Sequence, residues 1–101
     1  MVVEIAEIKI LPGTEADFEA AVEKATEYFQ LAKGCRSLKL HKIIENPLEY
    51  LLEIGWNDID DHLVTFRQSE AFQAWRTLVG SYFAEPPRVR HLNTVLDSFT
   101  Q

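Results

Sequence analysis

Residues 36–56 read RSLKLHKIIENPLEYLLEIGW, in which the pair Asn46-Pro47 separates two runs of strand-forming residues. In the first run, residues 36–44, apolar and polar side chains alternate along much of the length. The second run places four apolar side chains on one side of the chain: Tyr50, Leu52, Ile54 and Trp56. Alternation on both sides of a turn-forming pair is typical of a β-hairpin with one buried face. We therefore predict a pair of strands, from Arg36 to Ile44 and from Tyr50 to Trp56.

An amphipathic helix is predicted before the hairpin. Thr14 opens a sequence with the spacing of a capping box, so we expect its side chain to accept a hydrogen bond from a helix N–H. Gly34 supplies a residue that adopts the left-handed conformation at a helix end. Between them the apolar residues recur every three or four positions and form one stripe: Phe18, Ala21, Val22, Ala25, Tyr28, Phe29 and Ala32.

Two shorter helical pieces are predicted after the hairpin. The first follows a cap at Asn57 or Asp58, and its inward face is expected to contain Ile59, His62, Leu63 and Phe66. The second follows a cap at Ser69 and ends before the prolines at 86–87. Its bulky stripe consists of Phe72, Trp75, Leu78, Val79, Tyr82 and Phe83.

Strands are predicted at both ends of the chain, from Val2 to Ile10 and from Arg88 to Leu96. The order β-α-β-β-α-β matches an α+β, ferredoxin-like sandwich with an antiparallel sheet, in which residues 1–101 form a single domain. Helices cover one face of such a sheet, and the other face of this one also carries apolar residues. A second copy packed sheet against sheet would cover them, so we predict a two-fold homodimer through the sheet face.

Composition excludes several classes of protein. Apolar residues are 47% and charged residues 26% of the chain, as in an ordinary globular domain, and no apolar run is long enough for a membrane span. Ten Lys and Arg against sixteen Asp and Glu give a net charge of -6, the wrong sign for a nucleic-acid partner. The single cysteine, Cys35, forms no internal disulfide, and the charged start of the sequence is unlike a signal peptide. Both observations favour a reducing cytoplasm.

The second half of the chain carries a recognisable pattern. EIGW (residues 53–56) leads into the short helix, FRQSEAFQAWR (66–76) follows, and the prolines at 86–87 precede a strand with His91. This arrangement resembles the W…F-x-x-S-x-x-F core of the antibiotic biosynthesis monooxygenase family, and the resemblance covers residues 3–95. It implies a dimeric α/β barrel and one of several activities: cofactor-free oxygenation of polycyclic phenols and quinols, haem degradation, or isomerisation of signal molecules.

Two departures from the family pattern narrow these activities. Haem-degrading relatives carry an Asn on the first strand, a Trp just before the S-x-x-F segment and a His four residues after its Phe. This chain has no Asn in residues 2–10. Phe66 replaces the Trp, and Arg76 replaces the His. These differences disfavour a haem-degrading function. Quinol-oxidising and isomerase-type relatives tend to place a His where Phe66 stands, and here the nearest is His62, one helical turn earlier.

Together, the resemblance and the residue chemistry indicate a cofactor-independent monooxygenase that oxidises an aromatic phenol or quinol with O2. His62 is the candidate base, because the pKa of a histidine lies near neutrality, and Trp75 and His91 are expected to assist it. Alternatively, His62 is a core-edge histidine bonded to backbone, and His91 lies at the dimer surface. The candidate substrate-binding residues are Tyr28, Trp56, Phe66, Phe72, Arg76 and Tyr82, whose aromatic members also fit plain core packing.

Neither a metal nor a cofactor is predicted. The acidic and histidine side chains of residues 60–62 are consecutive, so they cannot all face one point on a helix. Arg67 and Arg76 are expected to pair with Glu70 or Asp61, with a substrate oxygen as the alternative partner. Three other functions stay open: a protein of the same fold that binds an aromatic metabolite without turning it over, a haem-binding or haem-degrading relative, and a purely structural dimer.

Overall fold

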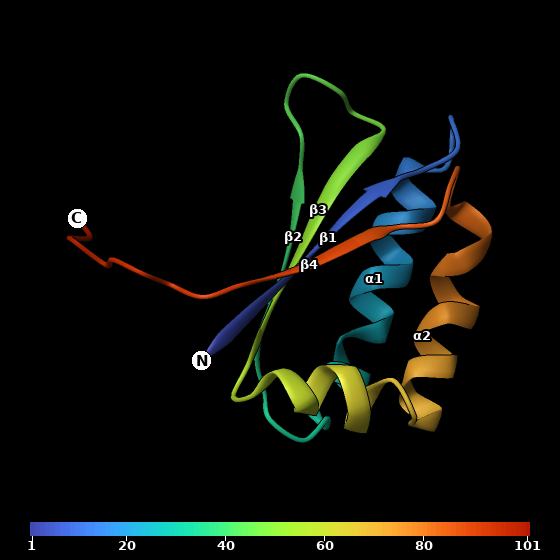
Figure 1. Cartoon of the computed structure of the whole chain (residues 1–101). Helices are drawn as coiled ribbons and strands as arrows, with labels where there is room; N and C mark the ends of the chain where they lie inside the picture. The colour runs from blue at the N-terminus through green and yellow to red at the C-terminus, as the bar shows by residue number, and fades with distance from the viewer.

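Helices cover one face of a four-stranded antiparallel sheet and leave the other face bare (Figure 1). The computed structural model describes residues 1–101. The elements in chain order are β1 (Val2–Lys9), α1 (Glu15–Gln30), β2 (Cys35–Lys42), β3 (Glu49–Trp56), the π-helix η1 (Asp61–Phe66), α2 (Glu70–Val79), the 3₁₀-helix η2 (Gly80–Tyr82) and β4 (Arg88–Leu92). The strand order β2-β3-β1-β4 confirms the predicted ferredoxin-like sandwich.

The register of the two central strands determines which side chains enter the core. β1 and β3 pair without a shift along their whole length, from Val2 opposite Trp56 to Lys9 opposite Glu49. Alternate residues therefore face the helices, and the buried ones are Glu4, Ala6, Ile8, Tyr50, Leu52, Ile54 and Trp56. The helices contribute Phe18, Val22, Ala25, Phe29, Trp75 and Val79. Within this buried set the single charged side chain is that of Glu4.

Of the three predicted helix caps, those at Asp58 and Ser69 form and that at Thr14 does not. Oδ1 of Asp58 accepts a hydrogen bond from the backbone N–H of Asp60 at 2.8 Å. The hydroxyl oxygen of Ser69 accepts a hydrogen bond from the backbone N–H of Phe72 at 3.2 Å, as expected for the start of α2. Thr14 instead donates its hydroxyl to the carbonyl oxygen of Leu11 at 2.6 Å. The difference follows from the backbone: Ser69 has the extended conformation of a capping residue, with ψ 158°, whereas Thr14 has ψ 9°.

The short helix after the hairpin is a π-helix, and this changes the face that it buries. The backbone N–H of Arg67 bonds to the carbonyl of His62, five residues earlier, at 3.1 Å. Because the turn is wider than an α-turn, residues three apart no longer share a face. Ile59 and Leu63, predicted to point inward, are 39% and 38% exposed, while His62 and Phe66 are buried as predicted.

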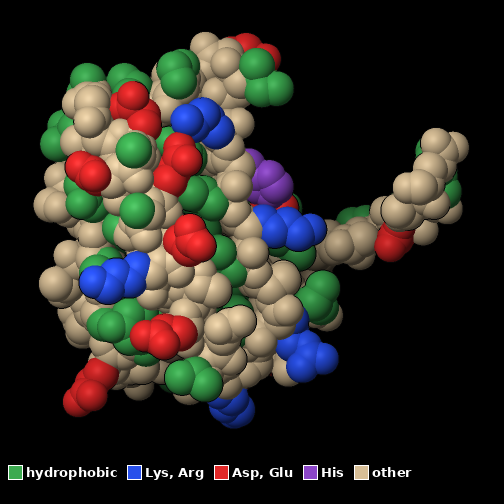
Figure 2. Space-filling model, turned by 180° about the vertical axis from the view of Figure 1, so that it is seen from behind, with side chains coloured by type: hydrophobic (Ala, Val, Ile, Leu, Met, Phe, Trp, Pro, Cys, Tyr) green, Lys and Arg blue, Asp and Glu red, His purple; other side chains and the backbone are tan.

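The fourth strand is shorter than predicted, and the chain after it leaves the body of the protein. β4 ends at Leu92 instead of Leu96. The remaining residues extend away on the bare side of the sheet (Figure 1), and the space-filling view shows this segment standing clear of the body (Figure 2). It carries three exposed apolar side chains: Val95, Leu96 and Phe99. No helix of the structure is long and apolar enough to cross a membrane.

Two glycines with positive φ offer a test of how η1 is held. Gly34 (φ +78°) and Gly13 (φ +81°) both require the left-handed conformation, but only at Gly34 would an added Cβ collide with a neighbour, the carboxylate of Asp61. We expect Gly13→Ala to lower the unfolding free energy by about 1 kcal/mol through backbone strain alone. Gly34→Ala should lower it by about 2–4 kcal/mol, since strain and the collision add. Urea denaturation measures both, and equal losses would contradict the contact.

Candidate functional site

A cavity of about 240 Å³ opens between the sheet and the helices where η1 and α2 meet. Ten of its fifteen lining residues are hydrophobic, and its aromatic wall consists of Phe66, Phe72 and Trp75, with Phe29 from α1 behind them. Phe66 and Phe72 meet edge to face at 5.7 Å, and Phe29 meets Trp75 in the same way at 5.1 Å. Such a wall fits the flat face of an aromatic ligand.

Three titratable side chains from distant parts of the sequence meet beside this cavity: the buried Glu4 and His62, and the half-buried His91. Nδ1 of His62 lies 2.8 Å from Nε2 of His91, in hydrogen-bond contact. Nε2 of His62 lies 3.3 Å from Oε1 of Glu4. The chain Glu4–His62–His91 thus joins β1, η1 and β4. His62 and Glu4 line the cavity, and His91 lies two residues along β4 from Val89, which also lines it.

Trp56 contacts both Glu4 and His62 and holds these two side chains in place. Its indole N–H donates to Oε1 of Glu4 at 2.9 Å, the same oxygen that faces His62. Its ring stacks on the His62 imidazole with 5.3 Å between centroids and 19° between planes. Because Trp56 is completely buried and does not line the cavity, it orients the two polar groups and has no face free for a ligand.

Burial and neighbouring charges shift the pKa values of Glu4, His62 and His91. Burial, together with the charges of His91 and Arg67, lowers the pKa of His62 from 6.5 to about 4. The pKa of His91 is also lowered, by burial and by Arg67. Burial raises the pKa of Glu4, against the opposing effects of the Trp56 hydrogen bond and of Arg67. Both histidines are therefore uncharged at neutral pH, so each ring has one N–H and one lone pair.

The arginines at the cavity do not make the ion pairs predicted for them. Asp61 pairs with Lys33 at 3.8 Å, and neither Arg67 nor Arg76 has a carboxylate within ion-pair distance. The guanidinium of Arg76 instead lies 5.9 Å from the Phe72 ring. Both arginines are exposed and line the cavity, so its outer part is positively charged.

The candidate residues of the sequence analysis divide into two groups. Lining one cavity are His62, Phe66, Phe72, Trp75 and Arg76, with His91 bonded to His62. Two tyrosines lie elsewhere. Tyr28 borders a separate hollow with Leu31 and Ala32, and Tyr82 packs edge to face against Phe18 at 6.4 Å.

Glu4 was not predicted as a site residue, although a signal for it exists. It has the parity of Ala6, Ile8 and Ile10, the apolar residues of the first strand, so alternation alone places a carboxylate on the core face. A carboxylate there needs hydrogen-bond donors. The partners that satisfy it, Trp56 and His62, are not visible in the linear sequence.

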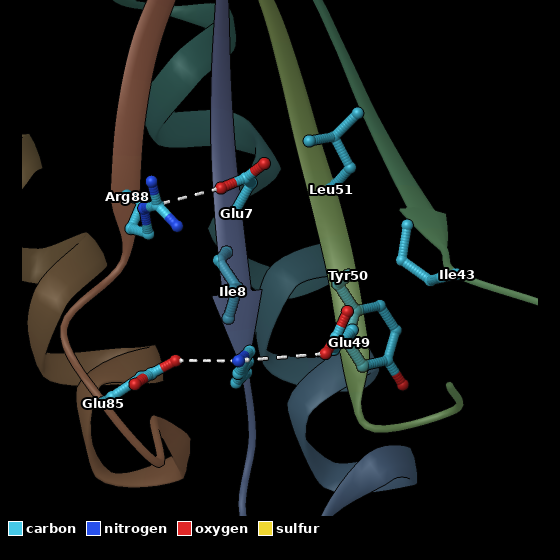
Figure 3. Close-up of a pocket in the computed structure, with 9 residues that line it drawn as sticks. Glu7, Ile8, Ile43, Glu49, Tyr50, Leu51, Glu85 and Arg88 are labelled. Atoms are coloured by element: carbon cyan, nitrogen blue, oxygen red, sulfur yellow. Dashed lines mark ion pairs between the residues drawn. The ribbon is translucent and has the colours of Figure 1, made fainter. Parts of the chain in front are cut away.

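A second hollow, of about 310 Å³, lies at the other end of β1 and β3 (Figure 3). Its charged side chains are paired with one another: Lys9 with Glu85 at 3.3 Å and Glu49 at 3.9 Å, and Arg88 with Glu7 at 3.8 Å. These pairs leave few free charges for a ligand. The cavity beside His62 is the better candidate, since it combines an aromatic wall, unpaired arginines and histidines with shifted pKa values.

Neither a metal nor a reactive thiol is suggested by the remaining candidates. No group of three or more His, Cys, Asp or Glu side chains is placed to hold a metal ion. Burial raises the pKa of Cys35, which keeps the thiol protonated.

The family model described as antibiotic biosynthesis monooxygenase matches residues 1–78. The YczJ protein of Bacillus subtilis, whose role is uncharacterised, is 34% identical over 95 residues, covering 94% of this chain and all of the relative. A crystal structure from Bordetella bronchiseptica, provisionally described as an antibiotic biosynthesis monooxygenase, is 52% identical with a TM-score of 0.92 and covers 94% of this chain and 97% of its own. The cofactor-independent oxygenase SnoaB from Streptomyces nogalater shares the fold at 14% identity, with a TM-score of 0.82 over 95% of this chain and 94% of its own.

The lowered pKa of His62 makes folding stability depend on pH. Folded His62 stays neutral down to about pH 4, whereas in the unfolded chain it binds a proton below its ordinary pKa of 6.5. Acid therefore favours the unfolded state, and stability is lost as the pH falls through this window. Between about pH 7 and about pH 5 we expect the wild type to lose about 1–2 kcal/mol more unfolding free energy than His62→Gln, measured by urea titration.

Glu4 acts in the opposite direction and provides the control for this measurement. Its raised pKa means that the folded protein binds a proton at Glu4 more readily than the unfolded chain does, which adds stability as the pH falls. Glu4→Gln removes this contribution, so its stability should decline more steeply in acid than that of the wild type. The same pH dependence in the wild type and in His62→Gln would contradict the assignment.

Proposed function

Because this chain belongs to the antibiotic biosynthesis monooxygenase family, we propose that it is a cofactor-independent monooxygenase that oxidises an aromatic phenol or quinol with O2. The observation that carries the proposal is the hydrogen-bonded pair of neutral histidines, His62 and His91, beside an aromatic cavity. Such a reaction needs a base for a phenolic proton, a dry apolar chamber and a substrate that supplies its own electrons.

In the proposed first step the histidine pair takes the phenolic proton. We assign the proton on neutral His62 to Nε2, because the facing Glu4 carboxylate accepts hydrogen bonds. Nδ1 of His62 then accepts the Nε2–H of His91, which leaves Nδ1 of His91 unprotonated. As the substrate proton arrives at His91, the Nε2 proton of His91 passes to His62, whose positive charge Glu4 stabilises.

The second step uses the electrons of the resulting phenolate. The ring carbon opposite or adjacent to the oxygen attacks O2, which gives a peroxide that takes a proton from the histidine pair. Loss of water then leaves a new carbonyl on the ring, so one oxygen atom enters the product and the other leaves as water. Phe66, Phe72 and Trp75 would stack against the ring and exclude solvent, and the Trp75 indole N–H and Arg76 are the donors for developing negative charge.

A specific observation also favours a second candidate function, the binding of an aromatic metabolite without turnover. Both ring nitrogens of His62 already have partners, Glu4 and His91, so the imidazole has no free atom for a substrate. If the pair is only structural, the cavity stores a ligand and consumes no oxygen.

The bare face of the sheet supports a homodimer, which completes the dimeric α/β barrel of this proposal. Val3, Ile5 and Leu51 lie on that face, opposite in parity to the core residues, and the apolar C-terminal segment leaves the body on the same side (Figure 1). We also propose that residues 1–101 act as one domain in a reducing cytoplasm, where the thiol of Cys35 stays free.

Oxygen uptake tests the proposed activity. Metal-free protein is mixed with a panel of anthrones, naphthols and hydroquinones in an oxygen electrode, and uptake well above the spontaneous rate is expected for at least one of them. His62→Ala should lower this catalysed rate by about 100-fold or more, because it removes the proton acceptor that Glu4 stabilises.

The matched control is the third histidine. His41 lies outside the cavity and contacts Glu53 at 3.1 Å, and a glutamine amide can also donate to Glu53, so His41→Gln should retain the wild-type rate. A flat response across the panel, with thermal stabilisation by the same compounds, would reject the oxygenase in favour of the binding function.

The oligomeric state tests the proposed dimer. Light scattering after gel filtration should give twice the monomer mass for the wild type, and Ile5→Glu should give the monomer, because it places a charge in the centre of the proposed interface. Leu31→Glu, at an exposed position beyond α1, should remain dimeric. A monomeric wild type at micromolar concentration would overturn this part of the proposal.

A further inference from the structure

We infer that the ligand of this cavity is a small aromatic acid: a one- or two-ring phenol with a carboxylate, which Arg67 and Arg76 bind at the cavity mouth. This inference rests on the proposed function for the phenol, and it adds the charge and the size of the substrate.

The negative charge of the ligand is inferred from two arginines that lack an acidic partner in the protein. The chain has a net charge of -6, so acidic partners are abundant, and the two arginines of β4 share one: Arg90 and Arg88 contact Glu7 at 3.0 and 3.8 Å. Arg67 and Arg76 have no such partner. Two unpaired guanidinium groups at one opening form a site for an anion, and their planar forks match a carboxylate.

The only carboxylate of the cavity, that of Glu4, forms no ion pair with either arginine, although the charge of Arg67 acts to lower its pKa. Glu4 is buried, accepts the Trp56 N–H and faces His62. The cavity therefore combines two exposed cationic side chains, an aromatic wall, and the buried His62, which is bonded to the half-buried His91. A phenol with a carboxylate on its far side matches all three parts at once.

The size of the cavity limits the ring system. Its volume of about 240 Å³ lies below the range of about 300–1,000 Å³ that is usual for drug-sized ligands. A small aromatic acid of one or two rings fits such a volume.

An anion at the mouth would also assist the proposed proton transfer. The positive charge of Arg67 lowers the pKa of both His62 and His91. A bound carboxylate offsets that charge, so the histidines become more basic when the substrate is in place. Substrate binding and base strength are then coupled through Arg67.

Calorimetry without oxygen tests this inference separately from turnover. The probes are 6-hydroxy-2-naphthoate, whose hydroxyl and carboxylate lie at opposite ends of the ring system, and its neutral amide, which differ in charge but hardly in shape. We expect the acid to bind at least about 10-fold more tightly than the amide, with a preference that weakens in high salt. The double variant Arg67→Gln/Arg76→Gln should lose this preference.

Lys24→Gln is the matched control, because it removes one unpaired positive charge from the outer side of α1, away from the cavity. It should bind both probes as the wild type does. Equal affinities of the wild type for acid and amide, or an unchanged preference in the double variant, would overturn the inference. Tight binding of the acid without oxygen consumption would instead reject the oxygenase and leave the aromatic-acid site in place.

Discussion

The buried carboxylate of Glu4 is the constraint around which this site is built. A carboxyl in an apolar core is stable only beside polar partners, and two come from separate elements: the Trp56 indole of β3 donates its N–H to Glu4 at 2.9 Å, and the His62 imidazole of η1 lies 3.3 Å from the same oxygen. Satisfying one side chain thus fixes the position of three elements. The stacked rings of Trp56 and His62 then hold η1 against the end of the sheet.

The sheet and the helices each contribute a different part of the cavity. The unshifted pairing of β1 with β3 brings Glu4 close to Trp56, although they are 52 residues apart. The helices contribute the aromatic wall of the cavity. Arg67 and Arg76 are exposed to solvent, whereas the carboxyl group of Glu4 is buried. Buried polar groups, an aromatic wall and exposed cationic side chains are the parts that an amphipathic ligand requires.

Most of the fold follows from periodicity, whereas only part of the site does. Alternation at period two and stripes at three and four residues predict every strand and both long helices, and the inward direction of His62 follows from its spacing with Phe66. The five-residue turn of η1 has no such signature, so Ile59 and Leu63 are misplaced. Ion pairs and hydrogen bonds depend on residues brought together by folding, which is why the partners of Glu4 and the unpaired state of Arg67 are found in the structure alone.

The π-helix has a consequence for how this site arises and disappears in evolution. A π-turn contains one residue more than an α-turn, so deletion of a single codon within residues 61–66 would restore α-helical spacing. The sheet and the aromatic wall would survive such a deletion, but the imidazole would rotate away from Glu4. One insertion or deletion in this segment would therefore create or abolish the histidine pair, so a correct alignment of sequences with and without the pair must allow a gap here.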